Sequence, residues 1–170
     1  MNPFATHIQV LQACLEHTTG PVLELGSGWF STPVLAAYAD TRLVRTVESD
    51  PNWFVRVAQL GVSQSLVNHR HQFVFVPRYD DAPVLDHHWD IVLLDHEPPA
   101  RRGVDALRLR EHCRLMIGHD SQHPAYEYTE AFGQFKFRFT DTRQVPWTTV
   151  VSDEPLNWLA QAVRFPEGLA

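Results

Sequence analysis

Two glycines and a glutamate lie at a spacing that can hold a nucleotide. Gly26-Ser27-Gly28 directly follows the mostly apolar run Val22–Leu25, and Glu48 lies twenty-two positions beyond Gly26. Glycine lets the backbone approach a ligand closely, and a carboxylate can accept hydrogen bonds from both hydroxyls of a ribose. An acidic residue roughly 20 positions after a glycine turn is typical of nucleotide-binding strand–helix–strand units. We therefore expect a site for an adenosine-containing cofactor here.

Four further polar residues stand where two later apolar runs end. One pair follows Trp89–Leu94, and the other follows Leu115–Gly118. Ligands bind outside the carboxyl ends of the strands in open α/β sheets, so the two pairs are expected to meet there. A histidine with a pKa of about 6.5 can take a proton from a hydroxyl or amine group. The predicted catalytic residues are Asp95, His96, His119 and Asp120, and the alternative is that they are surface loop residues without a catalytic role.

The basic residues limit the chemistry further. The chain has a single lysine, Lys136, so lysine-based covalent or general-base chemistry has almost no candidates. Arg101 and Arg102 could clamp an acidic group of a substrate, because arginine binds carboxylate or phosphate through paired hydrogen bonds. They could also form the solvated face of a helix. Trp29 and Phe30 lie inside the glycine loop, and the sequence assigns them no role.

Alternating helices and strands are expected to position these residues. Thr32 and Asp50 are the expected N-caps of two helices, because each precedes a proline that would occupy the first helical position. The helices are predicted at residues 4–17, from Thr32-Pro33, from Asp50-Pro51 to Gly61, at Arg101–His112 and at Pro124–Phe135. The strands are predicted at Val22–Leu25, Leu43–Val47, His71–Tyr79, Trp89–Asp95 and Leu115–Gly118.

Two β-rich segments close this pattern. Phe135–Phe139 alternates strictly and Thr148–Ser152 is β-branched, with a connection so short that the two should pair as an antiparallel hairpin. The near-continuous apolar run Trp89–Asp95 suits a parallel strand that is covered on both faces. The predicted fold is α/β: a doubly wound, Rossmann-like sheet, mostly parallel, with seven strands and a C-terminal antiparallel hairpin. We expect one domain, residues 1–170, with an N-terminal helix in 1–19, a core in 20–153 and a tail in 154–170.

Composition bounds the partners and the compartment. The 170 residues carry a net charge of -6, which argues against nucleic acid or an anionic membrane as the main partner. Cys14 and Cys113 match no metal-binding spacing and are expected to be packed or free thiols. No segment approaches the roughly 18 apolar residues of a membrane span, so we expect a soluble cytoplasmic protein.

These motifs together resemble the class I S-adenosylmethionine-dependent methyltransferases. Glu24–Gly28 looks like the first motif of that family, Glu48 like its acidic residue after the second strand, and Asp90–Asp95 like its fourth-strand motif. The terminal hairpin resembles the reversed last strand that separates these enzymes from dinucleotide dehydrogenases. A dehydrogenase fingerprint would also need a third glycine near position 31, where this chain has Ser31.

The resemblance implies roles for particular residues. Glu24 would help to hold the methionine amino end, Glu48 would bind the ribose, and Asp95 would face the methyl donor. Residues at the end of the third strand would contact the adenine, although a solvated turn is the alternative for them. The cofactor-binding residues predicted in this way are Glu24, Gly26, Ser27, Gly28, Glu48, Ser49, Tyr79, Asp80 and Asp95.

One branch of the family holds a divalent metal, and the chain departs from its pattern. The segment Leu94–His96 resembles the catechol O-methyltransferase group, in which a fourth-strand Asp and a later Asp-Asn pair bind the metal. Asp120 matches the second Asp, but Ser121 stands in place of the Asn, and no lysine matches the base of that group. We therefore predict no metal site from the sequence.

The resemblance implies an S-adenosylmethionine-dependent methyltransferase. We expect it to act on an oxygen or nitrogen of a small molecule, with a macromolecular side chain as the alternative acceptor. A non-catalytic cofactor-binding or scaffold module of the same fold is the main alternative, and an NAD-dependent oxidoreductase is a third. A second subunit could complete the site, which leaves a homodimer open.

Overall fold

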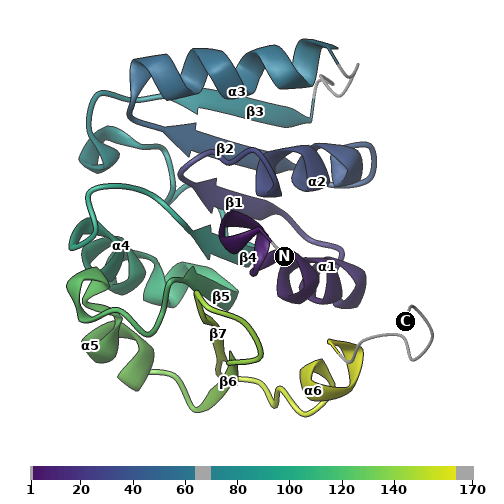
Figure 1. Cartoon of the computed structure of the whole chain (residues 1–170), viewed down its shortest axis with the longest axis vertical. Helices are drawn as coiled ribbons and strands as arrows, with labels where there is room; N and C mark the ends of the chain where they lie inside the picture. The colour runs from purple at the N-terminus through teal and green to yellow at the C-terminus, as the bar shows by residue number, and fades with distance from the viewer. Residues whose placement is uncertain (1, 64–69, 164–170) are drawn as a thin grey trace.

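The computed structural model describes residues 2–63 and 70–163 (Figure 1). Its strands are β1 (Val22–Leu25), β2 (Val44–Glu48), β3 (His71–Phe75), β4 (Trp89–Leu94), β5 (Cys113–His119), β6 (Phe137–Asp141) and β7 (Thr148–Ser152). Its helices are α1 (Ile8–His17), α2 (Ser31–Tyr38), α3 (Pro51–Ser63), α4 (Arg101–Leu109), α5 (Tyr128–Gly133) and α6 (Leu159–Ala162). Short 3-10 turns are η1 (Pro3–Ala5), η2 (Tyr79–Asp81), η3 (Arg110–His112) and η4 (Pro124–Tyr126).

All seven strands form one sheet in the order β3-β2-β1-β4-β5-β7-β6. The five strands from β3 to β5 are parallel, and β1 sits between β2 and β4, with Val22 opposite both Val44 and Ile91. β7 is antiparallel to both β5 and β6. The predicted mixed sheet with a reversed terminal hairpin is thus confirmed.

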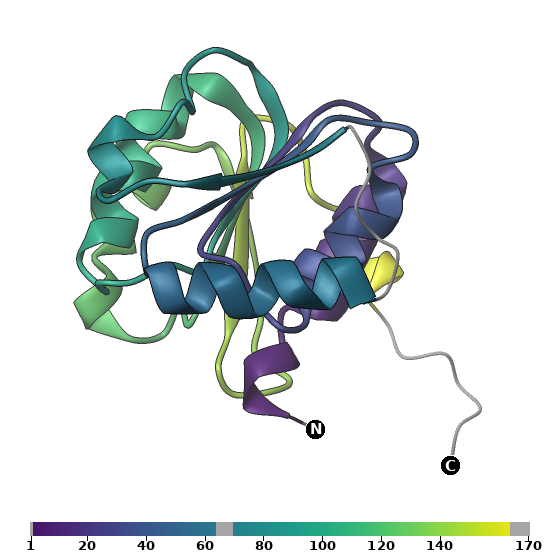
Figure 2. The same cartoon turned by 90° about the horizontal axis from the view of Figure 1, so that it is seen from above.

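Helices cover both faces of the sheet, as Figure 2 shows from above. In β1, Leu23 and Leu25 join the core under α4 and α5, whereas Val22 joins the core under α1, α2 and α6. Strands that are buried on both faces need apolar residues at nearly every position, which explains the near-continuous apolar run in β4, interrupted only by Asp90. Because helices cover both faces of the sheet, a site can form at the carboxyl ends of the parallel strands, which the helices leave open.

The N-terminal segment differs from its prediction. The apolar spacing of Phe4 with Ile8 and Leu11 predicts one helix over 4–17, but α1 begins at Ile8. Residues 3–5 instead form η1, which leaves Phe4 72% exposed. The prediction was wrong there because the apolar residue at position 4 packs against no core.

Two helix boundaries also differ. α2 begins at Ser31, so Thr32 lies inside the helix and is not its N-cap; its hydroxyl bonds the glycine loop instead. α3 continues through Gly61 to Ser63, so that glycine does not end the helix. The cap at Asp50 is confirmed, since its carboxylate accepts hydrogen bonds from the backbone N–H groups of Asn52 and Trp53.

The C-terminal third is more broken than predicted. The helix expected at 124–135 is split into η4 and α5 at Glu127, whose φ of 54° is left-handed and cannot continue a helix. β3 ends at Phe75, before the predicted Tyr79, and β6 begins at Phe137, two residues later than Phe135. Within residues 2–63 and 70–163, no helix has the length and apolar character needed to cross a membrane.

Candidate active site

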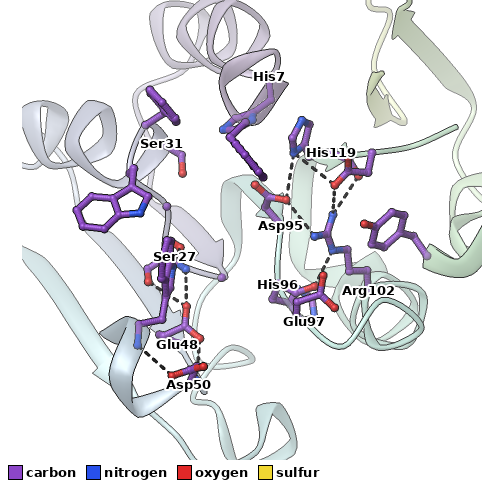
Figure 3. A pocket seen from close by; sticks show the side chains of 18 of the residues that line it. His7, Ser27, Ser31, Glu48, Asp50, Asp95, His96, Glu97, Arg102 and His119 are labelled. Atoms are coloured by element: carbon purple, nitrogen blue, oxygen red, sulfur yellow. Dashed lines mark hydrogen bonds and ion pairs between the residues drawn. The ribbon is translucent and has the colours of Figure 1, made fainter. Parts of the chain in front are cut away.

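A cavity of about 660 Å³ opens at the carboxyl ends of the parallel strands. Its volume is within the range of small-molecule sites. Figure 3 places the glycine loop and Glu48 on one side and the ends of β4 and β5 on the other. The predicted site residues that line it are Gly26, Ser27, Gly28, Glu48, Asp95, His96, His119 and Asp120. The lining that the sequence did not predict includes Asn2, Phe4, His7, Asp50, Trp53 and Tyr126, and the lining also includes Arg102, one of the two arginines expected either to clamp a substrate or to face solvent.

Glu48 ends β2 and is bound by four donors of its own chain. One carboxylate oxygen accepts from the backbone N–H and the hydroxyl of Ser27, at 3.0 and 2.9 Å. The other accepts from the backbone N–H groups of Ser49 and Asp50, at 2.7 and 2.8 Å. A carboxylate has about four acceptor sites, so a ribose hydroxyl must replace one of these donors. The Ser27 hydroxyl is the donor that can rotate away without moving the backbone.

The fold requires a glycine at position 26, whether or not a ligand is bound. Its φ of +87° is left-handed, and a Cβ atom there would lie 2.5 Å from the carbonyl oxygen of Asp95 and 2.6 Å from Cα of His96. The glycine loop therefore rests directly on the end of β4. At Gly28 an added Cβ would meet only the flexible hydroxyl of Ser31, at 2.7 Å. The close approach that needs a glycine is thus between two loops of the site.

Glu24 lies beneath the loop and does not line the cavity. It is fully buried in β1, and one oxygen accepts hydrogen bonds from the hydroxyls of Thr32 and Thr46, both at 2.8 Å. Thr32 in turn accepts from the backbone N–H of Gly28 at 2.9 Å. Burial raises the pKa of Glu24 to about 7, because the hydroxyl donors offset only part of the lost hydration. This chain of hydrogen bonds fixes the loop from below.

Trp29, to which the sequence assigned no role, packs against Trp53 beside the glycine loop. Its ring meets Trp53 edge to face, with centroids 5.3 Å apart, and the indole N–H of Trp53 donates to the backbone carbonyl of Ser27. Trp29 remains 42% exposed and lines the cavity. The pair braces the glycine loop and gives the cavity an aromatic wall.

Besides Glu24, three predicted cofactor contacts lie outside the cavity lining. Ser49 contributes its backbone N–H to Glu48. Tyr79 is buried, and its ring packs against His96 with centroids 4.3 Å apart. Asp80 is mostly exposed and pairs with Arg101 at 2.8 Å. For Tyr79 and Asp80, contact with an adenine remains a prediction.

Arg102 organises the opposite side of the cavity. Its guanidinium is almost fully buried and pairs with Asp95 at 3.1 Å and Asp120 at 3.2 Å. It also donates to the backbone carbonyls of His96 and His119. Arg102 therefore clamps the ends of β4 and β5 together, and it is bound to the protein's own carboxylates. Its neighbour Arg101 is likewise bound, to Asp105 at 2.7 Å.

His119 is held between an acid and a hydroxyl. Its Nδ1 lies 3.1 Å from Oδ1 of Asp95, and its Nε2 lies 3.0 Å from the hydroxyl of Thr6. Thr6 donates that hydroxyl hydrogen to the carbonyl of Pro146 at 2.9 Å, so it must accept from Nε2–H of His119. This arrangement favours the tautomer of His119 that is protonated at Nε2. Burial opposes ionisation of Asp95, but its interactions with His119 and the positive charge of Arg102 hold its pKa below the ordinary value.

His7 enters the site from the turn before α1. Its side chain is 1% exposed, and neither ring nitrogen has a hydrogen-bond partner among the residues that the structure describes. The ring lies 4.4 Å from that of His119, centroid to centroid. Burial lowers the pKa of His7 to about 4, so the ring is neutral at pH 7. Sequence spacing gave no signal for this residue, since it lies 88 positions before Asp95.

His96, by contrast, is part of a buried ion-pair network. Its imidazole is 0% exposed and lies 3.0 Å from Asp105, which also binds Arg101. Burial lowers the pKa of His96, and the partnership with Asp105 only partly opposes this. The ring supports the loop after β4 and is not presented to the cavity as an open group.

The residues do not fit the metal set of the catechol O-methyltransferase group. Among the described residues, Asp120 does not join the side chains whose ligand atoms converge on Asp95, and the hydroxyl of Ser121 accepts a hydrogen bond from Thr149 at 2.8 Å. The three side chains that do converge are His7, Asp95 and His119, whose nearest polar atoms all lie within 4.8 Å of one another.

Comparison with known proteins finds solved structures with a similar fold. Neither a family model nor a curated protein matches the sequence. Among solved structures, cofactor-bound Rv0187 from MTB is 20% identical with a TM-score of 0.64, over 91% of this chain and 82% of that one. The O-methyltransferase TomG from Streptomyces achromogenes, in complex with S-adenosylmethionine, is 20% identical with a TM-score of 0.62, over 85% and 78%. The N-terminal domain of human METTL16, in complex with S-adenosylhomocysteine, is 16% identical with a TM-score of 0.56, over 88% and 68%.

At these identities the similarity concerns the fold. The strand order with its reversed β7, the glycine loop after β1 and the acid at the end of β2 agree with it. The chain has the fold of the class I S-adenosylmethionine-dependent methyltransferases.

Proposed function

We propose that this protein is an S-adenosylmethionine-dependent methyltransferase that acts on an oxygen or nitrogen of a small molecule. The observation that carries the proposal is one cavity with two different ends. Glu48 and the glycine loop form a ribose-binding end, and Asp95 with His119 forms a polar end across from it. Two neighbours of the same fold were solved with the methyl donor or its product.

At the donor end, Glu48 accepts the ribose hydroxyls after the Ser27 hydroxyl has turned away. The backbone of the glycine loop, held by Glu24 and Trp53, keeps the cofactor against the end of β1. Catalysis then rests mainly on holding the methyl group in line with the acceptor, which is worth up to roughly 7–11 kcal/mol.

At the acceptor end, Asp95 and His119 are the groups that contact the substrate. The methyl group leaves the sulfonium for the acceptor atom, S-adenosylhomocysteine is released, and the proton that the acceptor atom gives up passes to His119 or Asp95. His96 and Asp120, also predicted as catalytic, act in this proposal as positioning residues through Arg102, which binds the carbonyl of the first and the carboxylate of the second.

The cavity favours a small acceptor. Its aromatic side chains Phe4 and Trp29, 72% and 42% exposed, can pack against a flat or apolar molecule. The net charge of -6 disfavours nucleic acid. Both cysteines are free and buried, which suits the reducing cytoplasm that the sequence predicts. A homodimer remains a prediction.

Calorimetry with S-adenosylmethionine and S-adenosylhomocysteine tests the donor site. We expect micromolar binding that Glu48→Ala abolishes and that Glu16→Ala, a change at an exposed acid of α1, leaves intact. Absence of binding by the wild-type protein would refute the proposal. Tighter binding of NAD would favour an oxidoreductase.

A screen for S-adenosylhomocysteine release with a panel of small hydroxyl and amine acceptors separates the enzyme from a binding module. Release above the rate without acceptor supports turnover. Cofactor binding without release from any acceptor favours the non-catalytic alternative, which shares the fold and the cavity.

A further inference from the structure

We propose that His7, Asp95 and His119 form a site for a divalent transition-metal cation at the polar end of the cavity. The three residues come from the turn before α1, the end of β4 and the end of β5, and Figure 3 shows them facing one another. Their ligand atoms lie within 4.8 Å of one another. A cation with bonds of about 2.1 Å holds neighbouring ligands about 3–4 Å apart, so shifts of about 1 Å or less close the set.

The hydrogen bonds of His119 favour a positive charge between its Nδ1 and the carboxylate of Asp95. Thr6 accepts from Nε2–H, so a neutral His119 points the lone pair of Nδ1 at the carboxylate oxygen of Asp95, 3.1 Å away. Two acceptors at that distance repel unless a proton or a metal cation lies between them. The Thr6 contact also has the form of an outer-shell bond that orients a metal-bound imidazole.

The position of His7 favours a metal cation, rather than a shared proton, as the positive charge between Asp95 and His119. A proton shared by Asp95 and His119 needs no third group, yet a buried imidazole stands beside them with neither nitrogen bonded within the described residues. Leaving a buried polar atom unpaired is costly, and most buried polar groups in proteins are paired. A cation that accepts the lone pair of His7 accounts for its position.

The surrounding charge permits a cation. Arg102 supplies one positive charge at this end, against the carboxylates of Asp95 and Asp120, which leaves one negative charge uncompensated when both histidines are neutral. Two imidazoles and one carboxylate suit Zn²⁺, Fe²⁺, Co²⁺ or Mn²⁺ better than Mg²⁺, which prefers oxygen ligands. Three protein ligands leave coordination positions open toward the cavity.

The role of the site rests on the proposed function. A divalent cation there would bind the acceptor oxygen or nitrogen and favour its deprotonated form. The ligand set differs from the one that the fold family implied, because the N-terminal turn supplies His7 and Asp120 is not among the converging side chains of the described residues.

Titration of the chelator-treated protein with Co²⁺, followed by visible absorption, and with Zn²⁺, followed by calorimetry, tests the inference. We expect one equivalent of either ion to bind. His7→Ala, His7→Leu and His119→Ala should each weaken binding by more than about 100-fold, and Thr6→Val by about 10- to 100-fold, the usual loss for an outer-shell partner. His88→Ala is the matched control, because His88 is exposed and precedes β4 at the opposite end of the strands from the cavity. This variant should bind either ion as the wild type does.

S-adenosylhomocysteine binding by each variant shows that it is folded and separates the two proposals. If the wild type binds neither Co²⁺ nor Zn²⁺ in stoichiometric amounts, or if His7→Ala binds as tightly as His88→Ala, the cation site is refuted. Product binding without metal binding leaves the proposed function standing. Metal binding without cofactor binding refutes the proposed function and keeps the site.

Discussion

Replacing Gly26 with alanine should destabilise the protein by about 3 kcal/mol. At a φ of +87° a side chain costs about 1–2 kcal/mol in backbone strain alone. The new Cβ would lie 2.5 Å from the Asp95 carbonyl, so the loop must retreat by roughly 0.9 Å to reach ordinary contact at about 3.4 Å. That movement strains the hydrogen bonds Gly26 N–Val47 O and Asp95 N–Leu25 O, both 2.9 Å and each worth about 1 kcal/mol.

Two other glycines provide matched controls. Gly28→Ala meets only the flexible Ser31 hydroxyl and should cost less than about 1 kcal/mol. Gly133→Ala, at the exposed end of α5 with no atom within 4 Å, should stabilise the protein by about 0.4–1 kcal/mol. Urea unfolding followed by circular dichroism measures all three.

If Gly26→Ala unfolds within about 0.5 kcal/mol of the wild type, the reasoning is refuted. A Gly26→Ala protein that is stable but does not bind S-adenosylmethionine would show that this glycine serves the ligand and not the contact between loop and strand.

Three further perturbations follow from buried groups. Because burial raises the pKa of Glu24 to about 7 from an ordinary 4.5, the folded state binds more protons between these values; unfolding free energy should fall as the pH rises from about 4.5 to 7, by about 3 kcal/mol relative to Glu24→Gln. His7→Leu removes two unpaired buried nitrogens and should stabilise the metal-free protein by about 1–3 kcal/mol in urea unfolding. Arg102→Met leaves Asp95 and Asp120 without their counter-charge and should lower the unfolding free energy by about 3 kcal/mol.

Each of these has a contradicting outcome. An unchanged pH dependence in Glu24→Gln would mean that this carboxyl ionises normally in the folded protein. A loss of stability in His7→Leu would point to a packing role for the ring. A neutral Arg102→Met change would show that the two acids do not depend on the guanidinium.

The sequence predicted the sheet well because its strands follow strong local rules. The near-continuous apolar run of β4 and the β-branched run of β7 leave few alternatives for buried strands. Helix boundaries were predicted less well. Thr32 is a good N-cap by composition, but its hydroxyl is used by Glu24 and Gly28, a contact between segments that no local rule contains.

Spacing along the chain pointed to Gly26 and Glu48 on one side of the cavity, whereas on the other side the sequence indicated Asp95 and His119 but not their partners Thr6 and His7. Glu48 and Gly26 belong to one strand–helix–strand unit, so their distance along the chain carries information. His7 and Thr6 reach the site only because the N-terminal turn lies over the ends of β4 and β5. The sequence left Arg102 as either a clamp for a substrate acid or a solvated helix residue, and only the fold brings two carboxylates of the protein to it.

A crystal structure of the protein with S-adenosylhomocysteine would test the central claim most directly. We expect the ribose hydroxyls at hydrogen-bonding distance from the Glu48 carboxylate, with the Ser27 hydroxyl turned away, and the sulfur facing Asp95 and His119. A product molecule bound elsewhere, or bound in this cavity with its ribose away from Glu48, would contradict the account.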